Sequence, residues 1–445
     1  MIRKILTLCI AVCIALTANA QKVNISFTEY DLSNGLHVIL HQDNSTPNVV
    51  VSLMYHVGSK DENPERTGFA HLFEHLMFEG SEHIGRGEFM KIVPANGGEF
   101  NANTSFDRTY YFELLPSNQL ELGLWLESER MLHAKIDSIG IATQKNVVIE
   151  ERKQVVENQQ YGTFFEKILE NAFKEHHYRW HIIGNPEHIR NSTDQDVLDF
   201  YNMYYVPNNA VLVITGDFQT ENAKKLVEKY FGDIPRGKKQ ITRYSIVEKP
   251  LGGEIRDVVY DNIMLPAVFM GYRSPAYGTK DFYVFEIINS ILSEGNSSRF
   301  KDNIDNKKKA MQSALLTMPC EEPFISIALG IANAGAKIED TEAALNHEID
   351  SIVNYLVSAD ELQKAIAAKE TSIISSKNSI ANIAHELATY YTYFRNAKMI
   401  NNELANYSNI TREEIQRVAK KYLHPDNRVV LHYLPKSMQP KEQTQ

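Results

Sequence analysis

Alternating hydrophobic residues near the start of the chain predict a β-strand. Leu36, Val38 and Leu40 follow an Asn-Gly turn at residues 34–35 and occupy every second position. Successive side chains of a strand point to opposite faces of its sheet. We therefore expect these three residues to share one buried face.

Four longer stretches extend this pattern. Residues 47–59 and 109–115 are rich in β-branched and aromatic residues, which is typical of strands, whereas residues 118–134 and 142–158 have the spacing of long helices. These elements do not follow a regular alternation of strand and helix. The sequence therefore predicts an α+β fold with mainly antiparallel sheets packed with helices.

A helix-to-strand unit occurs twice in the chain. Residues 193–213 and 411–431 each open with a Thr followed three residues later by an acid, continue as an amphipathic helix, and run through P-x-N-x-V into a strand. Pro207 and Pro425 differ by 425 − 207 = 218 positions, and the two units align without a gap. Chance resemblance is the alternative, but the constant offset favours a duplication and two homologous domains.

Chain length agrees with two domains, because a single core rarely spans 445 residues. We place the first domain at residues 21–238 and a linker rich in Gly, Pro and Lys at 239–254. The second domain is expected at 255–436, and a short polar tail at 437–445.

The start of the chain has the composition of a targeting segment. Arg3 and Lys4 precede an apolar stretch that ends in an A-x-A cleavage pattern at residues 18–20. We predict a signal peptide at residues 1–20, cleaved after Ala20, and a mature protein that is periplasmic or secreted. A membrane anchor is the alternative, but the apolar stretch is short for a span and no second one follows, so we expect no stable membrane insertion.

Composition limits the function further. Without the signal peptide, Cys320 is the only cysteine, so no disulfide framework can form. The mature chain loses Arg3 and Lys4, which leaves a net charge of 44 − 56 = −12. A chain this acidic is a poor candidate for binding nucleic acid, and we expect no nucleic-acid partner.

Two histidines and a glutamate interrupt the apolar segment at residues 68–80. His71 and His75 are four residues apart, so on a helix they share a face and can bind one ion through neutral imidazole nitrogens. Glu74 lies beside them, and the order H-x-x-E-H suits a zinc ion with an adjacent general base. Two hydrogen-bonded core histidines are the alternative, but burying three polar groups without a shared purpose is costly.

A catalytic zinc normally has three protein ligands, so one ligand is missing from this segment. Glu151 is spaced four, three and four residues from Val147, Val148 and Val155, which predicts that it lies on a buried helical face. A carboxylate there needs a partner, and a metal held by the two histidines would be one. Glu150 projects to the side as an ordinary surface residue. A surface position is also the alternative for Glu151.

Three segments together resemble the pitrilysin or M16 family of zinc peptidases, and the shorter relatives of mitochondrial processing peptidase fit best. They are GFAHLFEHLMFEGS, NGGEFNANTSFDRTYYFEL and NVVIEERKQVVENQQYG. In that family the third zinc ligand follows the second histidine by 76 residues, and 75 + 76 = 151. The resemblance covers essentially the whole mature chain. It implies the LuxS/MPP-like metallohydrolase fold, one Zn²⁺ ion bound by His71, His75 and Glu151, and Glu74 as the base that activates the zinc-bound water.

The resemblance also assigns supporting residues. The family often has an acid seven residues before the glutamate ligand, and the uncharged Gln144 stands there in this chain, which weakens any hydrogen-bonded support of the zinc site. The family binds the substrate backbone along an exposed edge strand near the zinc. The corresponding residues are Phe100, Asn101, Ala102, Asn103 and Thr104, for which an ordinary internal strand is the alternative.

One part of the family pattern is absent. Active single-chain relatives usually carry an Arg and a Tyr in the second half that hold the substrate carbonyl. Alignment on residues 298–300 puts Asp305 at the Arg position and Gln312 at the Tyr position, with Lys307–Lys309 nearby. We therefore expect a homodimer or a heterodimer, and favour a zinc-bearing subunit that works with a paralogue carrying the Arg and the Tyr.

The second half also lacks the metal motif. Adding 218 to His71 and His75 leads to Asn289 and Ser293, which are not zinc ligands, so we expect one zinc per chain. We expect the adjacent pair at residues 176–177 to be structural or surface histidines.

The sequence thus predicts a zinc-dependent endopeptidase, or the catalytic subunit of one, that hydrolyses unstructured peptides. A non-catalytic structural or binding subunit is the first alternative, but all four motif residues are intact. A metal-dependent hydrolase of a non-peptide substrate is the second, because zinc and a glutamate do not by themselves name a substrate.

Overall fold

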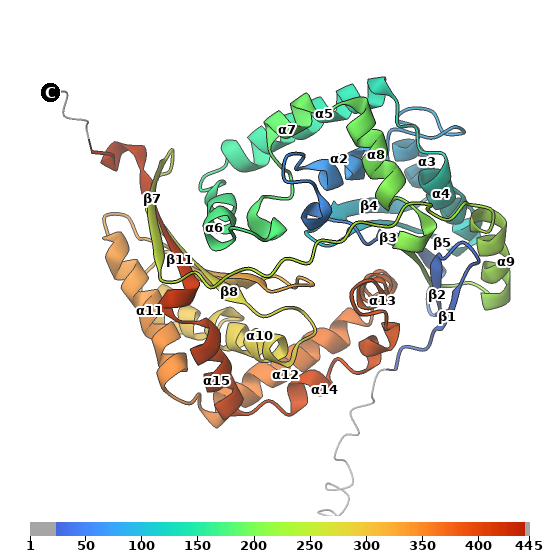
Figure 1. Cartoon of the computed structure of the whole chain (residues 1–445). Coiled ribbons are helices and arrows are strands. Elements are labelled where there is room, and N and C mark those ends of the chain that lie inside the picture. The colour runs from blue at the N-terminus through green and yellow to red at the C-terminus, as the bar shows by residue number, and fades with distance from the viewer. Residues whose placement is uncertain (1–23, 441–445) are drawn as a thin grey trace, which may run out of the picture.

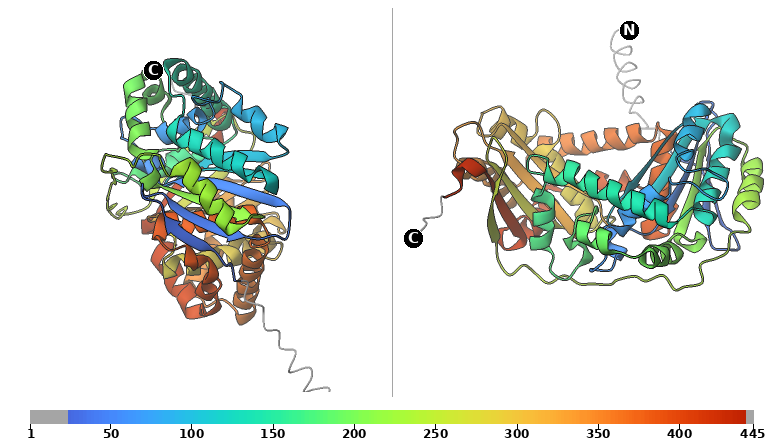
Figure 2. Two further views of the ribbon diagram at one scale, coloured as in Figure 1. Left: turned by 90° about the vertical axis from the view of Figure 1, so that its right-hand side faces the viewer. Right: turned by 90° about the horizontal axis from the view of Figure 1, so that it is seen from above.

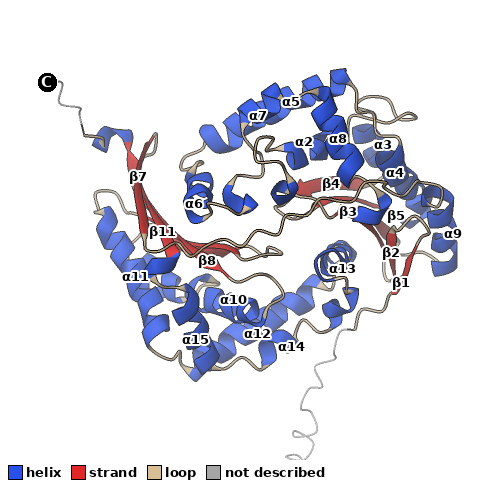
Figure 3. Ribbon diagram, viewed as in Figure 1, coloured by secondary structure: helices blue, strands red, loops and turns tan. Residues whose placement is uncertain are grey.

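Two mixed β-sheets, one in each half of the chain, organise the computed structural model, which describes residues 24–440 (Figure 1, Figure 3). Helices pack against both sheets, which confirms the predicted α+β fold with two similar domains. The predicted signal peptide lies outside the described residues. Between residues 24 and 440, no helix is both long and apolar enough to cross a membrane.

The first sheet contains six strands: β1 (Thr28–Asp31), β2 (His37–Gln42), β3 (Asn48–Tyr55), β4 (Glu99–Thr104), β5 (Thr109–Pro116) and β6 (Ala210–Gly216). Their order is β1-β2-β6-β3-β5-β4. β2 and β6 are parallel, and the other neighbouring pairs are antiparallel. β4 is therefore an edge strand, as expected for residues 100–104.

The second sheet contains β7 (Ile255–Asp261), β8 (Ala267–Ser274), β9 (Gln312–Thr317), β10 (Phe324–Ile331) and β11 (Arg428–Pro435). Their order is β7-β11-β8-β10-β9, again with one parallel pair, β7 and β11. This order repeats β2-β6-β3-β5-β4 of the first sheet. The shared topology supports the predicted duplication, and both sheets are mainly antiparallel as expected.

The helices of the first half are α2 (Phe69–Leu76), α3 (Phe89–Ala95), α4 (Leu120–Leu132), α5 (Ser138–Arg152), α6 (Phe164–Ala172), α7 (Pro186–Asn191), α8 (Asp194–Tyr204) and α9 (Thr220–Phe231). Those of the second half are α10 (Lys280–Ser293), α11 (Ile338–Asn354), α12 (Ala359–Ser376), α13 (Ile380–Phe394), α14 (Ala405–Ser408) and α15 (Arg412–Tyr422). The long helices predicted at 118–134 and 142–158 correspond to α4 and α5. α5 starts earlier because Asp137 caps it, and it passes into a π-helical turn at residues 153–157.

The two halves exchange equivalent helices. α13 of the second half packs against β3 and β6 of the first sheet, whereas α6 of the first half packs against β8 and β11 of the second (Figure 1). Adding 218 to the ends of α6, residues 164 and 172, gives 382 and 390, which lie within α13. Each exchanged helix is part of the other half's apolar core: Leu387 packs in one cluster with Val213, and Ile168 in another with Val429.

Leu36, Val38 and Leu40 share one buried face as predicted, and the exchanged helix covers the opposite face of the strand as well. β2 is buried on both faces: Val38 belongs to the core of the first domain, and Ile39 to the cluster that includes α13. His37 is also buried, and its ring stacks on Tyr391 of α13 with centroids 3.4 Å apart. Local alternation did not reveal the second buried face because its cover comes from the other half of the chain.

An extended segment connects the two halves. Residues 233–254 form no helix or strand and run along one side of the molecule between α9 and β7 (Figure 2). The linker predicted at 239–254 lies inside this segment. The domain boundaries themselves stay a prediction.

A buried polar network also joins the domains. Lys60 Nζ lies 2.9 Å from Asp107 Oδ1 and forms an ion pair with Glu321 of the second half. Asp107 is fully buried and accepts hydrogen bonds from the Tyr178 hydroxyl at 2.6 Å and from the backbone N–H of Glu321 at 3.0 Å. His56 Nε2 is 3.0 Å from Glu321 Oε2. The network satisfies charges that burial would otherwise make costly.

Two adjacent histidines extend the network. His176 Nε2 lies 2.9 Å from Glu322 Oε2, and His177 Nδ1 lies 2.7 Å from the carbonyl oxygen of Lys60. Both side chains are buried, so this pair is structural, one of the two predicted outcomes, and does not lie on the surface.

We predict that Glu321→Gln lowers the free energy of unfolding at neutral pH by about 1–3 kcal/mol. Burial opposes ionisation, but hydrogen bonds and charge from His56 and Lys60 outweigh it and lower the pKa of Glu321 from 4.5 to about 2. A lowered folded pKa gives stability that is present above pH 4.5 and lost as the pH falls towards 2. Urea unfolding across this acidic range should show a flatter pH dependence for the variant.

The exposed Glu413 provides the control, because Glu413→Gln should leave both the stability and its pH dependence unchanged. If Glu321→Gln had the free energy of unfolding and the pH dependence of the wild type, the network would not stabilise the contact between the domains.

Candidate metal centre

The helix α2 carries its apolar residues on one face. Phe69, Leu72, Phe73 and Leu76 follow the spacing i, i+3, i+4, i+7 and are all buried in the first domain's core. The histidines therefore fall on the other side of the helix. This face meets α5 and the edge strand β4.

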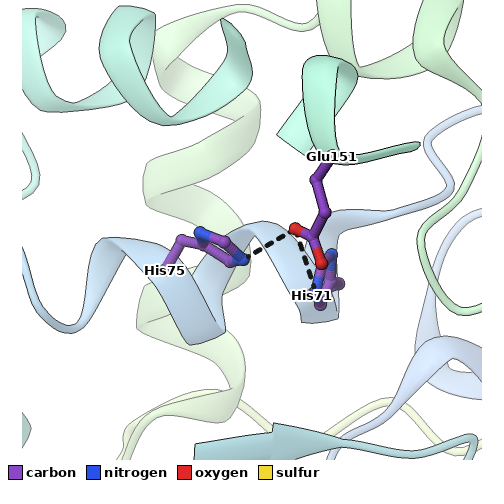
Figure 4. Close-up of side chains that lie close together, drawn as sticks. All are labelled: His71, His75 and Glu151. Carbon is purple, nitrogen blue, oxygen red and sulfur yellow. Dashed lines mark ion pairs between the residues drawn. The ribbon is translucent and has the colours of Figure 1, made fainter. Parts of the chain in front are cut away.

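His71, His75 and Glu151 converge at this face (Figure 4). Glu151 Oε2 lies 3.2 Å from His75 Nε2 and 3.8 Å from His71 Nε2, and one ligand atom from each residue lies within 4.8 Å of the others. Burial is the main cause that lowers the pKa of His71 to about 4, so its imidazole is neutral, as a metal ligand must be. The adjacent His75 imidazole lowers the pKa of Glu151 despite partial burial.

The donor set fits a metal ion on independent grounds. The His71 Nδ1 and Glu151 Oε2 atoms are buried and have no hydrogen-bond partner among the described residues. Two imidazoles and a carboxylate are the ligands of many catalytic zinc sites. A bound ion would satisfy the oxygen that the protein leaves unpaired.

The structure corrects the reasoning that selected Glu151. Val148 is buried as expected, but Val147 is 42% exposed and Val155 is 50% exposed. The buried side of α5 is formed by Ile141, Val148 and Arg152, and Glu151 stands at its border. α5 ends at Arg152 and a π-helical turn follows, so the α-helical i, i+4 spacing does not place Val155 on the same face as Glu151. Glu150, expected at the surface, is exposed and pairs with Lys153.

Glu74 points towards the edge strand. The Thr104 hydroxyl, at the end of β4, donates a hydrogen bond of 2.6 Å to Glu74 Oε2. Burial raises the pKa of Glu74 above its usual value of 4.5, and this hydrogen bond partly opposes the rise. A carboxylate with a raised pKa is suited to accept and return a proton near neutral pH. The sequence did not indicate this contact, because its two partners are 30 residues apart.

A cavity of about 360 Å³ opens beside Glu74 and His75. Phe78, Met90 and Phe100 form apolar parts of its wall. Phe100 and Ala102 of β4 line it, and with Thr104 they occupy the partly buried side of that strand, because alternate residues share a face. Asn101 and Asn103 are both exposed, and of these two residues Asn101 also lines the cavity.

Gln144 lies at this cavity, and its side-chain hydrogen bond goes to Glu79 and not to the three converging residues. Its side-chain N–H donates to the buried Glu79, which also forms an ion pair with Arg86. The Gln144 side-chain oxygen is buried without a hydrogen-bond partner among the described residues. The hydrogen bond from Gln144 to Glu79 thus links α5 to the segment that follows α2.

Sequence reasoning missed the residue that holds the start of α2. The Glu62 carboxylate is almost fully buried and accepts hydrogen bonds from the backbone N–H groups of Gly68 at 2.9 Å and Ala70 at 2.8 Å. Trp180 Nε1 donates a third at 3.1 Å. The residue before the helix, Gly68, has φ +92° and no side chain that could cap the helix, so the Glu62 carboxylate satisfies the first amides instead. An acid a few residues before a Gly-led helix was the available signal.

The described part of the second domain contains no equivalent site. Asn289 and Ser293 lie on α10, and no group of three metal-ligating side chains occurs in the described part of this domain. Asp305 ends a π-helical turn and accepts a hydrogen bond from Ser313, whereas Gln312 begins β9. β9 is an edge strand and corresponds to β4 of the first sheet.

Comparison with protein families matches both halves. The family described as "Insulinase (Peptidase family M16)" matches residues 37–186, and "Peptidase M16 inactive domain" matches residues 191–369. The chain belongs to peptidase family M16. The match to the first half includes the converging residues His71, His75 and Glu151.

Individual relatives match most of this chain, and two of the three described below also match it over most of their own length. The zinc protease PqqE of Helicobacter pylori is 29% identical over 406 residues, covering 88% of this chain and 89% of that protein. A solved protease from Helicobacter pylori superposes with a TM-score of 0.88 at 27% identity, covering 92% of this chain and 100% of the other. The periplasmic protease PqqL from Escherichia coli shares the fold, with a TM-score of 0.75 at 17% identity, and this chain covers 49% of it.

We predict that Glu62→Ala lowers the free energy of unfolding of this M16 chain by about 2 kcal/mol, because two buried backbone N–H donors lose their acceptor at about 1 kcal/mol each. Trp180 Nε1 keeps the carbonyl oxygen of Ser59 as an acceptor at 3.0 Å. Chemical denaturation monitored by circular dichroism measures the loss. Glu65→Ala is the matched control, since Glu65 lies in the same loop but is exposed. Equal stabilities of the two variants would contradict the capping role of Glu62.

Proposed function

We propose that this chain is a zinc-dependent endopeptidase, or the catalytic subunit of one, that hydrolyses unstructured peptides. The observation that carries the proposal is the convergence of His71, His75 and Glu151 beside Glu74, at an edge strand and a cavity. Membership of a peptidase family and the zinc protease PqqE as a relative support it.

In this proposal His71, His75 and Glu151 hold one zinc ion. Zinc bound there would lower the pKa of a water ligand and polarise a peptide carbonyl. Glu74 accepts the proton of the attacking water and returns it to the leaving amine. The Thr104 hydroxyl orients the Glu74 carboxylate through the hydrogen bond that it donates. Gln144 supports the site only indirectly, through Glu79.

The substrate would bind as an added strand along β4. Its residues Phe100, Asn101, Ala102, Asn103 and Thr104 lie at the edge of the first sheet, where backbone groups are available to an extended peptide. Such binding depends little on sequence and requires an unfolded segment. The adjacent cavity, with Phe78 and Met90 in its wall, suits an apolar side chain.

We predict that Glu74→Gln retains bound zinc but reduces peptide hydrolysis by at least about 100-fold, because the amide cannot accept the proton. Metal analysis of the purified chain and cleavage of a quenched fluorescent peptide measure the two properties. Wild-type activity in this variant would exclude Glu74 as the base, and a wild-type protein without bound metal would exclude the mechanism.

Two adjacent glutamates provide the matched control. Glu151→Gln should lose both zinc and activity, because it removes a charged ligand. Glu150→Gln should retain both, because Glu150 is exposed and pairs only with Lys153. Equal zinc content in these two variants would contradict the role of Glu151.

We also propose that full activity requires a second M16 chain. Asp305 and Gln312 replace the Arg and Tyr expected to hold the substrate carbonyl, so this chain lacks two groups that stabilise developing negative charge. PqqL supports a paired arrangement, because this chain covers only about half of it. The periplasmic location in PqqL's name also supports export of this protein, which its predicted signal peptide would direct.

We predict weak peptide cleavage by the purified chain and strong stimulation by a paralogue that carries the Arg and the Tyr. The assay compares the chain alone, the paralogue alone and their mixture. The same paralogue with its Arg and Tyr replaced serves as the control and should not stimulate. High activity of the chain alone would contradict partner dependence without affecting the zinc mechanism.

A further inference from the structure

A second group of metal-ligating side chains lies in the first domain, outside the site described above. His83 lies in the segment between α2 and α3. His133 is the first residue after α4, and Glu129 lies one helical turn earlier on that helix. One ligand atom from each of the three residues lies within 4.8 Å of the others, as at the first site. Neither the family match nor the named relatives assign a role to this group.

The distances fit a common ion. His83 Nδ1 lies 3.0 Å from Glu129 Oε1, and the rings of His83 and His133 have centroids 5.3 Å apart and meet edge to face. Ligand atoms around a tetrahedral zinc ion at about 2.0–2.2 Å lie about 3.3–3.6 Å from one another. The His83–Glu129 separation is close to this value, and the 4.8 Å limit on the remaining pairs leaves only short side-chain movements to reach it.

The backbone already holds the two histidine segments together. Ser81 and Ala134 form an isolated antiparallel bridge. The N–H of Glu82 donates to the carbonyl oxygen of His133 at 3.0 Å, and the N–H of Lys135 donates to that of Gly80 at 2.9 Å. Preorganised ligands lose less conformational freedom when an ion binds.

The carboxylate of Glu129 supplies an independent argument. Its side chain is only 6% exposed, and an acid is rarely buried to this extent without charge compensation. Its partners are the Ser81 hydroxyl and the His83 ring, neither of which is a permanent cation. A divalent ion beside Glu129 would provide the missing positive charge.

We propose that His83, Glu129 and His133 form a second divalent metal site. Two imidazoles and one carboxylate select zinc or a similar transition metal over Mg²⁺ and Ca²⁺, which prefer oxygen ligands. Glu82 Oε2 lies 3.1 Å from His133 Nδ1 and places a further carboxylate beside this ring. With the first site, the chain then binds two ions, which revises the predicted count of one.

The role of this site is structural. The ion links the segment that follows α2 to the end of α4, and both elements belong to the first domain's core. It thereby fixes the loop that leads away from the helix carrying His71 and His75. Metal binding at this site forms coordination bonds only, and no covalent bond of the chain is broken.

The experiment measures zinc binding by calorimetric titration of the full chain. His71→Ala combined with His75→Ala removes the first site, and this background should still bind one zinc ion. Adding His83→Ala or His133→Ala should abolish that remaining ion. Adding His347→Ala, which removes an exposed histidine of α11, should not. Mg²⁺ in place of zinc should show no binding at this site.

Thermal unfolding provides the second readout. Zinc should raise the Tm of the background variant, and this rise should disappear with His133→Ala, whose metal-free Tm should match that of the background. A background that binds no zinc, or that keeps its ion after either substitution, overturns the proposal. Failure of the first site alone gives a different pattern, since wild type would then bind a single ion that depends on His83 and His133.

Discussion

The cost of burying polar groups on an apolar helix is the constraint on which the first domain depends. α2 must bury Phe69, Leu72, Phe73 and Leu76 to complete the core, and this fixes the direction of its other face. That face carries imidazoles that need partners. Glu151, brought in by α5, is the partner of both imidazoles, and a metal ion bound there would satisfy all three side chains.

Two further contacts depend on the position of α2. Its first amides are held by Glu62, whose carboxylate comes from the loop before the helix and is fixed in turn by Trp180. Its polar face meets β4 through the Thr104–Glu74 hydrogen bond. The edge of the first sheet, Glu74 and the three converging side chains therefore occupy a single region, and a shift of the helix would disturb all of them together.

The exchange of α6 and α13 explains why the halves form one molecule. Each sheet buries a face against a helix from the other half, so neither apolar core is complete alone. The polar network around Lys60 and Asp107 adds directional contacts at the same junction. The two sheets share a topology, but α10, the equivalent of α2, carries Asn289 and Ser293 where α2 carries His71 and His75. Among the described residues, this convergence of side chains therefore occurs in the first half alone.

The sequence by itself determined the α+β class, the repeat, the helix that bears His71 and His75, and the identity of Glu151 as the third converging residue. These follow from short-range spacing and from the family resemblance, which do not require contacts to be known. Only the tertiary structure decided that β2 is covered on both faces, that Val147 and Val155 are exposed, that Glu62 caps α2, and that Glu129 meets His83. Each of these depends on which distant segment packs against a residue, and local periodicity contains no information about that partner.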